Sequence, residues 1–166
     1  DGFEDEDGCP DSDNDQDGVL DTQDACPNDG RVDSEKVHPN GCPLIQIHGG
    51  KLTVATPIRF ASGSDILPED AHDVLKALVR FMKNRPQADR LRVEGYTDLW
   101  GSPTYNAQLG KKRAQVVKAK LLDLGLEAER IEAFGRGIEA PIGDGKTTLN
   151  AQQSRRVEFY LSLSNR

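Results

Sequence analysis

One stretch of the sequence, residues 95–114, carries an acid and a base that could serve a single binding cleft. Asp98 follows a predicted strand at a turn, and Arg113 lies on the helix predicted next. A carboxylate and a guanidinium that reach one cleft can hold a zwitterionic amino-acid head, because the acid binds the ammonium and the base binds the carboxylate. The spacing leaves a second interpretation open, in which Asp98 and Arg113 form an internal salt bridge that only orders the loop.

The helix that carries Arg113 is expected to turn this residue toward the protein interior. Asn106, Leu109 and Arg113 are spaced at i, i+3 and i+7, so they share one helix face. The same face continues through the apolar residues Val116, Val117 and Leu121. We therefore expect Arg113 at the rim of the core, where a guanidinium needs a partner.

The elements that position these residues follow an α+β pattern. Strands are predicted at 44–48, 51–60, 90–96, 130–136 and 155–163, and helices at 68–84 and 103–124. Pro68 suits the first position of a helix, and Ser102 before Pro103 suits a second helix start, with Gly125 as its stop. The order β(β)αβαββ predicts a mixed sheet with helices on one face.

The charge distribution divides the chain into two predicted domains, 1–43 and 44–166. Residues 1–43 hold 14 acidic and two basic residues, whereas residues 44–166 hold 14 acidic and 19 basic residues. The first segment has almost no large apolar residues and cannot build a core of its own. With a mean hydropathy of −0.63 and no apolar run near 18 residues, the sequence predicts neither a transmembrane helix nor a signal peptide.

The acids of the first segment have the spacing of calcium ligands. The pattern DxDxDGxxDxxD supplies side chains at loop positions 1, 3, 5, 9 and 12 and a backbone carbonyl at position 7, from Asp13, Asp15, Asp17, Asp21, Asp24 and Val19. Carboxylates this close repel one another unless a cation neutralises them. CPDS before the loop and ACPND after it exclude the two helices of an EF-hand. The segment resembles thrombospondin type 3 repeats, which bind calcium without flanking helices; the other interpretation is a disordered acidic linker.

Two further features of the first segment concern its ends and its cysteines. Residues 1–7 match the second half of the same loop, so we expect the chain to begin inside a repeat. The three cysteines have no His pair or CxxC beside them, which argues against zinc. A segment with little core gains most from a disulfide. We predict Cys26–Cys42, with Cys9–Cys26 as the alternative, and either pairing implies an oxidising compartment.

One longer motif spans the turn after the third predicted strand and the helix that follows it. Its members are Thr97, Asp98, Gly101, Asn106, Leu109, Arg113 and Ala114. With the stretches IRFASGSDIL, IEAFGRGIEAPI and QQSRRVEFYL, this motif makes residues 53–163 resemble an OmpA-like, peptidoglycan-binding C-terminal domain, whose family motif is TDxxGxxxxNxxLSxxRA. Three positions depart from the pattern: Gly110 replaces the usual Ser, Tyr96 replaces a frequent His, and Ser154 replaces the Asn that usually precedes Arg155.

The resemblance implies a ligand and a set of contacts. Asp98 and Arg113 would clasp the free amino and carboxyl groups of meso-diaminopimelate in the peptidoglycan stem peptide. The remaining predicted ligand-binding residues are Asn106 and Thr97 of the motif, and Ser64 and Asp65 from the opposite wall. The implied function is a non-catalytic tether between the cell wall and an upstream outer-membrane anchor, at the periplasmic face of the outer membrane.

Other classes of function compete with the tether. A calcium-dependent adhesion or structural module of the cell envelope is the alternative. A peptidoglycan hydrolase would need a general acid or a metal site, and the sequence offers neither, so we expect no enzyme. The Lys111-Lys112-Arg113 run could suggest nucleic acid, but aromatics at 5% give no stacking platform. Trp100 either packs on Pro103 or lines the ligand cleft.

Overall fold

A computed structural model of the chain describes residues 13–14, 19–23, 45–48, 50–54, 56–86, 88–144 and 146–163. Its helices are α1 (Ala71–Lys83), α2 (Pro103–Asp123) and α3 (Thr148–Ser154), with a 3₁₀ turn η1 (Ala128–Arg130). Its strands are β1 (Ile45–His48), β2 (Lys51–Val54), β3 (Ala88–Tyr96), β4 (Ile131–Gly137) and β5 (Val157–Leu163). These elements all lie within the predicted second domain.

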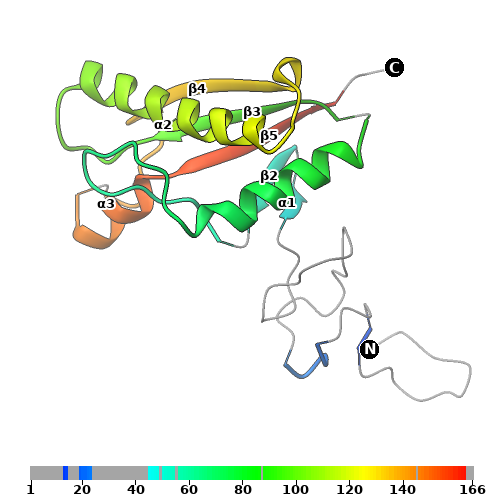
Figure 1. The fold of residues 1–166 in the computed structure, drawn as a ribbon. Coiled ribbons are helices and arrows are strands. Elements are labelled where there is room, and N and C mark those ends of the chain that lie inside the picture. The colour runs from blue at the N-terminus through cyan, green and yellow to red at the C-terminus, as the bar shows by residue number, and fades with distance from the viewer. Residues whose placement is uncertain are drawn as a thin grey trace, which may run out of the picture.

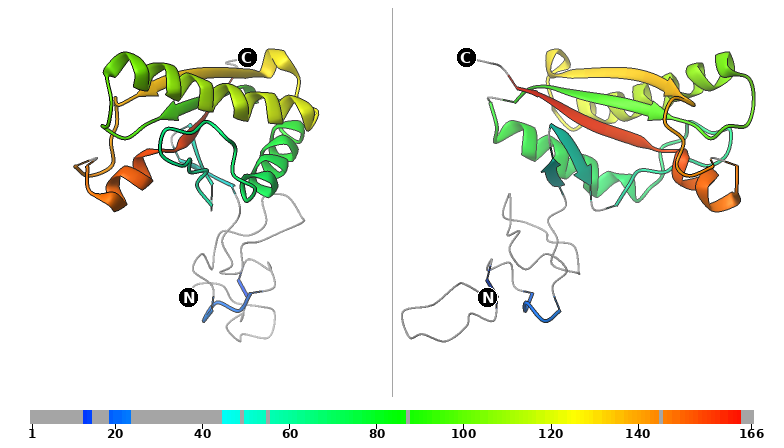
Figure 2. Two further views of the ribbon diagram at one scale, coloured as in Figure 1. Left: turned by 60° about the vertical axis from the view of Figure 1, so that its left-hand side comes forward. Right: turned by 180° about the vertical axis from the view of Figure 1, so that it is seen from behind.

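The strands form one mixed sheet in the order β1-β2-β5-β3-β4. β3 and β4 are parallel, and the other neighbours are antiparallel. Helices α1 and α2 cover one face of this sheet (Figure 1), and the view from behind shows the strands in front of them (Figure 2). The predicted α+β architecture, a mixed sheet with helices on one face, is confirmed.

The core lies between this sheet face and the two helices. Alternating side chains of β3 and β5 point into it, and both helices contribute apolar residues at three- and four-residue spacing. The fully buried members include Leu75, Leu78 and Met82 of α1, Val117 and Leu121 of α2, and Leu91, Val93 and Phe159 of the strands. This core fixes α2 against β3, and α2 is the helix that carries Arg113.

The first helix begins three residues later than the sequence predicts. It starts at Ala71 instead of Pro68, with Asp70 as its N-cap residue. The N–H groups of Ala71 and His72 donate to the carbonyls of Pro68 and Glu69, each at 3.2 Å. These i→i+3 bonds make residues 68–70 a turn that leads into the helix, so the prediction that Pro68 opens the helix is wrong.

The strand predicted at 51–60 is also shorter in the structure. β2 ends at Val54, and Pro57, which lacks a backbone N–H, stands just beyond it. The chain then returns to the sheet, where Arg59 forms an isolated antiparallel bridge with Arg156. This return places residues 58–60 beside the start of β5, at the end of the sheet where the candidate site lies.

The short helix α3 is not part of the sequence prediction, and it explains how Ser154 works in place of Asn. Thr147 caps the helix, because its Oγ1 accepts a hydrogen bond from the Asn150 N–H at 3.4 Å. Ser154 is fully buried; its hydroxyl donates to the Asn150 carbonyl at 2.7 Å and accepts from the Ile142 N–H at 2.8 Å. The serine therefore ties the preceding loop to the start of β5.

Helix α2 and strand β3 approach so closely that side chains are excluded between them. A Cβ atom on Gly95 would overlap the carbonyl oxygen of Gly110, and a Cβ atom on Gly110 would overlap the carbonyl oxygen of Gly95. Both obstacles are backbone atoms, which cannot rotate away. The close contact gives a physical reason for Gly110, where the family pattern usually has Ser.

On the other sheet face, two carboxylates lie directly opposite each other, Glu94 on β3 and Glu158 on β5. Such a like-charge pair is destabilising unless cations separate it. Glu94 is contacted by Tyr96 Oη and Arg136 Nη2 at 2.7 Å and by Arg92 Nε at 2.9 Å. Glu158 is contacted by Lys51 Nζ, Tyr160 Oη and Arg156 Nε, each at 2.7 Å.

These contacts predict acid-sensitive stability. Burial alone would raise the pKa of Glu158, but hydrogen bonds from Lys51, Tyr160 and Arg156 outweigh it and lower the pKa from 4.5 to about 2. A carboxylate with a depressed folded-state pKa stabilises fully above its unfolded pKa and loses that contribution as pH falls through the folded pKa. Between about pH 5 and pH 2, the free energy of unfolding of Glu158→Gln should therefore fall by roughly 2 kcal/mol less than that of the wild type.

Urea unfolding at both pH values measures this difference. The exposed Glu129→Gln variant is the control, and it should keep the wild-type pH dependence. An unchanged pH dependence in Glu158→Gln would contradict the assigned role of Glu158.

Candidate functional site

A pocket of about 230 Å³ opens where the loop after β3 meets the start of α2 and the loop after Phe60. It is lined by Ser62, Gly63, Asp98, Trp100, Gly101, Tyr105, Asn106, Leu109 and Arg113. Three of the predicted ligand-binding residues, Asp98, Asn106 and Arg113, thus face one pocket, whereas Thr97, Ser64 and Asp65 are not in its lining. Their binding roles stay predictions.

Arg113 is the most deeply placed charge of this pocket. It is 0% exposed and lies inside the core, so the prediction from the sequence that it lies at the rim of the core is wrong. Its guanidinium donates to three main-chain carbonyls, from Nε to Ser64 at 2.8 Å, from Nη1 to Tyr96 at 2.9 Å and from Nη2 to Ala61 at 3.0 Å. It also lies over the ring of Phe60, 5.1 Å from the ring centroid.

The electrostatic surroundings of Arg113 are those of a buried cation. Burial lowers its pKa to about 10, the negative charge of Asp98 opposes this shift, and the positive charge of Arg155 adds to it. A pKa of about 10 keeps the guanidinium protonated at neutral pH. A buried charge of this kind is stable only when it is hydrogen-bonded and, in general, paired with an opposite charge.

Asp98 makes its ion pair with Arg155, which the sequence did not single out. Asp98 Oδ2 accepts a hydrogen bond from Arg155 Nη1 at 3.0 Å, and the two side chains are 8% and 13% exposed. Asp98 Oδ1 accepts from the Trp100 N–H at 3.3 Å. In the described part of the chain, Asp98 and Arg113 are therefore not paired with each other. The salt-bridge interpretation of this pair does not describe the structure.

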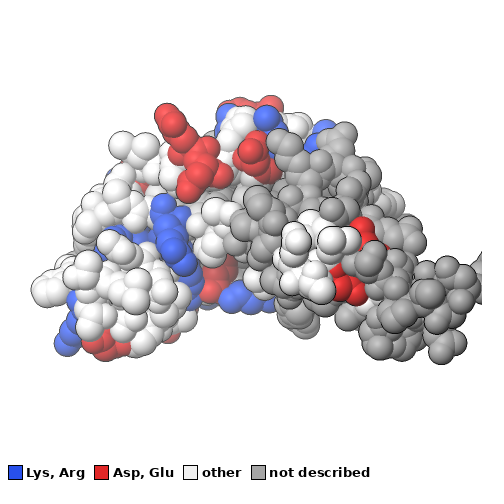
Figure 3. All heavy atoms as spheres, turned by 90° about the horizontal axis from the view of Figure 1, so that it is seen from below, with Lys and Arg blue, Asp and Glu red and all other residues white. Residues whose placement is uncertain are grey.

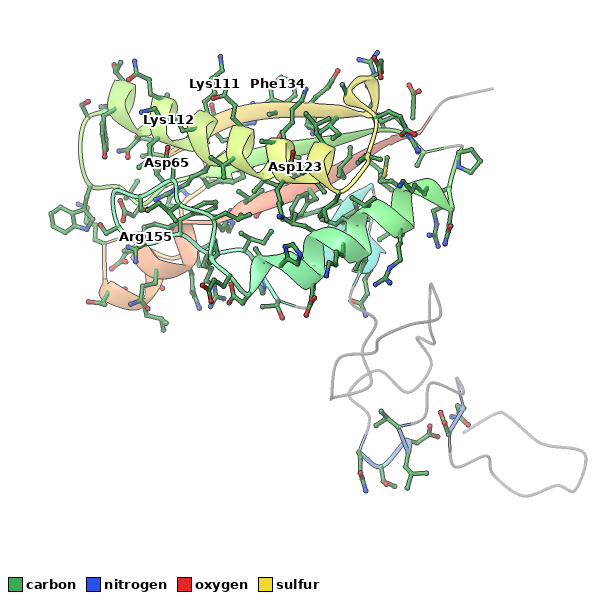
Figure 4. All side chains as sticks on the ribbon, in the orientation of Figure 1. Asp65, Lys111, Lys112, Asp123, Phe134 and Arg155 are labelled. Atoms are coloured by element: carbon green, nitrogen blue, oxygen red, sulfur yellow. The ribbon has the colours of Figure 1, made fainter. Side chains whose placement is uncertain are left out.

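Arg155 is itself fixed from both its main chain and its side chain. Its Nε donates to the Phe60 carbonyl at 3.0 Å, and its own carbonyl accepts from the Phe60 N–H at 2.8 Å. Figure 4 labels Arg155 and Asp65 near the same end of the molecule. The adjacent Arg156 serves the other sheet face, through Glu158. Successive residues of a strand point to opposite faces, so two arginines at the start of a predicted strand are the signal that could have revealed Arg155.

The other predicted residues mainly hold the walls of the pocket. Asn106 Nδ2 donates to the Trp100 carbonyl at 3.0 Å, and this bond braces the loop that carries Trp100. Thr97 Oγ1 donates to the Asp98 carbonyl at 3.0 Å. Ser64 contributes its carbonyl to Arg113, and its Oγ accepts from the Ile66 N–H at 3.1 Å.

Aromatic side chains form the rim. Trp100 lines the pocket and is 64% exposed, and Tyr105 lines it as well and is half exposed. The main chain of Trp100 is held by Asp98 on one side and Asn106 on the other. Of the two alternatives for Trp100, the structure favours the position beside the cleft.

The basic run on α2 does not act as a unit. Arg113 is buried, whereas Lys111 and Lys112 are exposed, and Figure 4 labels both on α2. On the lower face, Figure 3 shows acidic and basic side chains interspersed among the described residues. A nucleic-acid site would need a continuous basic field, so neither observation supports one.

Most of the predicted calcium and disulfide residues lie outside the described residues. This holds for Asp15, Asp17 and Asp24 of the loop and for Cys9, Cys26 and Cys42. Asp13, Val19 and Asp21 are described. The Asn14 N–H donates to Asp21 Oδ1 at 3.0 Å, which joins positions 2 and 9 of the predicted loop.

Fold and site together define an α+β domain with a small charged pocket at the end of its sheet. A model of the OmpA family matches residues 59–156, more than half of the chain, and the protein belongs to this family. Among the described residues, the structure contains no helix long and apolar enough to cross a membrane.

Individual relatives agree with this assignment. The chain is 35% identical over 151 residues to outer membrane porin F of Pseudomonas aeruginosa, covering 90% of this chain and 41% of that protein. It is 32% identical over 107 residues to the peptidoglycan-binding protein ArfA of Mycobacterium tuberculosis, covering 64% and 32%. The crystal structure of the peptidoglycan-associated lipoprotein from Burkholderia pseudomallei is similar, with a TM-score of 0.61, 28% identity and coverage of 65% and 92%. The chain spans less than half of the length of each of these two sequence relatives.

Proposed function

We propose that this chain binds peptidoglycan without catalysis, through the free amino-acid head of meso-diaminopimelate in the stem peptide. The environment of Arg113 carries this proposal. Arg113 is a fully buried cation that lines an open pocket, and its direct hydrogen-bond partners are main-chain carbonyls. A neutral carbonyl satisfies an N–H group but does not balance a charge. A carboxylate from a ligand would supply that balance.

The number of hydrogen-bond donors on the guanidinium supports a two-point contact with a ligand carboxylate. An arginine side chain has five N–H groups, and the three carbonyls take one each from Nε, Nη1 and Nη2. One N–H group therefore remains on each terminal nitrogen. A carboxylate fits such a pair in a bidentate arrangement, which is the strongest form of charge-assisted hydrogen bond.

Asp98 lies across the same pocket and is the residue that we assign to the ligand's ammonium group. Each charge-assisted contact contributes about 1.5–3 kcal/mol before the costs of ordering. A net of roughly 4–6 kcal/mol corresponds to a dissociation constant between about millimolar and tens of micromolar. Weak single contacts suit a tether, because many copies on one polymer bind with avidity.

The relatives support the ligand class and the location. ArfA is named for peptidoglycan binding, and the Burkholderia structure is of a peptidoglycan-associated lipoprotein. Porin F is an outer membrane protein. We therefore place this chain at the periplasmic face of the outer membrane, with a membrane anchor upstream, where it tethers that membrane to the cell wall.

We further propose that the segment 1–43 binds calcium and spaces the peptidoglycan-binding domain from its anchor. The hydrogen bond that closes the loop between Asn14 and Asp21 favours this role. Calcium removal should make segment 1–43 at least about tenfold more sensitive to proteolysis, because its carboxylates would then repel one another. Limited proteolysis with calcium and with EGTA measures this change, and equal cleavage rates would contradict the calcium proposal.

Pull-down with purified sacculi tests the function itself. We expect wild-type chain to bind, Arg113→Lys to lose most of its binding, and Asp98→Asn to be weakened as well. EGTA should leave binding almost unchanged, whereas a calcium-dependent adhesion module would lose its partner. Full binding by both variants would contradict the site, and release of sugar or peptide fragments would point to a hydrolase.

A further inference from the structure

We infer that the pocket recognises chiefly the carboxylate of the ligand head, and that Arg155 causes this preference by neutralising Asp98 in advance. This inference rests on the proposed function and specifies which half of the amino-acid head provides the binding.

The two charges that face the ligand are not equivalent. Asp98 already has a cation at 3.0 Å, in a pair whose two side chains are almost buried. Arg113 has three carbonyls and an aromatic ring but, among the described residues, no carboxylate in direct contact. Asp65 acts on Arg113 only at longer range.

The carboxylate and the ammonium of a zwitterionic ligand head therefore meet different surroundings in the pocket. The ligand's carboxylate gives Arg113 the first anion that it contacts directly. The ligand's ammonium instead becomes the second cation on Asp98, and it must share the carboxylate with Arg155. Removing the ligand's carboxylate should therefore weaken binding far more than removing its ammonium.

Arg155 is well placed for such a role because it cannot follow the ligand. Its Nε is bound to the Phe60 carbonyl and its main chain to the Phe60 N–H. The ring of the same Phe60 lies against Arg113. Arg155 thus acts as a positioning residue that holds Asp98 through an ion pair.

Three matched tripeptides separate the contributions. All have the form L-Ala-γ-D-Glu-X, where X is meso-diaminopimelate, 2-aminopimelate, which lacks the distal ammonium, or lysine, which lacks the distal carboxylate. In calorimetric titrations of the full chain, we expect 2-aminopimelate to bind within about threefold of diaminopimelate, and lysine about 10- to 100-fold more weakly. Equal losses for both analogues, or a larger loss for 2-aminopimelate, would overturn the inference.

Arg155→Gln then tests the cause. Without its permanent partner, Asp98 should depend on the ligand's ammonium, so the affinity ratio of diaminopimelate to 2-aminopimelate should rise to about tenfold. Arg155→Lys keeps the charge and should keep the wild-type ratio. If Arg155 were only structural, the three affinities would fall by one common factor, which would overturn its assigned role.

Arg130, an arginine away from the pocket, provides the control. Arg130 also donates to three main-chain carbonyls, those of Met82, Arg85 and Ala88, none of which lines the pocket. Arg130→Gln should leave the ratio unchanged. If wild-type chain binds none of the three tripeptides, the proposed function fails; if it binds diaminopimelate but does not rank the analogues as above, only this inference fails.

Discussion

Replacing Arg113 with alanine should abolish binding of the diaminopimelate tripeptide and lower the free energy of unfolding by about 3–5 kcal/mol. The guanidinium satisfies the buried carbonyls of Ala61, Ser64 and Tyr96, and it stacks on Phe60. Alanine would leave these carbonyls without donors and would create a cavity. Urea denaturation and calorimetric titration measure the two losses.

Two further variants separate stability from recognition. Arg113→Lys retains a positive charge but cannot make the three carbonyl bonds and a bidentate contact together, so it should bind at least about tenfold more weakly. Arg130→Gln should be destabilised, because the three carbonyls that Arg130 contacts lose their donor, but it should bind the tripeptide normally. An Arg113→Ala chain that is as stable as wild type, or that binds the tripeptide equally well, would contradict the site.

Gly95→Ala should destabilise the chain by about 3 kcal/mol, although the same change in an ordinary strand stabilises by roughly 0.5–1 kcal/mol. The added Cβ would overlap the carbonyl oxygen of Gly110, a backbone atom of α2. The helix would have to move outward, and it carries both Asn106 and Arg113. We therefore expect tripeptide binding to fall together with stability, measured in the same two experiments.

Gly50→Ala is the matched control for this prediction. A Cβ at Gly50 would have its nearest neighbour at an ordinary 3.7 Å, but the backbone has a φ of +83°. The expected cost is about 1 kcal/mol of backbone strain, with tripeptide binding unchanged. A Gly95→Ala chain no less stable than Gly50→Ala would show that α2 and β3 are not in the close contact described above.

Local signals allowed much of the fold to be predicted. α2 begins at Pro103 and ends at Asp123, as the cap at Ser102 and the stop at Gly125 indicate. The start of α1 could not be placed in the same way, because Pro68 is compatible both with a first helical turn and with the turn that precedes a helix. Which one forms depends on packing that the local sequence does not contain.

The site was predictable in part, for a reason that the contacts make clear. Asp98, Asn106 and Arg113 lie close together in the sequence, so one motif contains all three. The partners that define their chemistry are remote: the carbonyls of Ser64 and Ala61 lie 49 and 52 residues from Arg113, and Arg155 lies 57 residues from Asp98. Main-chain acceptors carry no residue-type signal, so only the fold reveals them.

A crystal structure of the chain bound to L-Ala-γ-D-Glu-meso-diaminopimelate tests the central claim most directly. We predict the distal carboxylate of the ligand within hydrogen-bond distance of both Nη atoms of Arg113. We predict its ammonium beside Asp98, with the Asp98–Arg155 ion pair retained. A tripeptide bound away from this pocket, or bound in it with its carboxylate directed away from Arg113, would contradict the account.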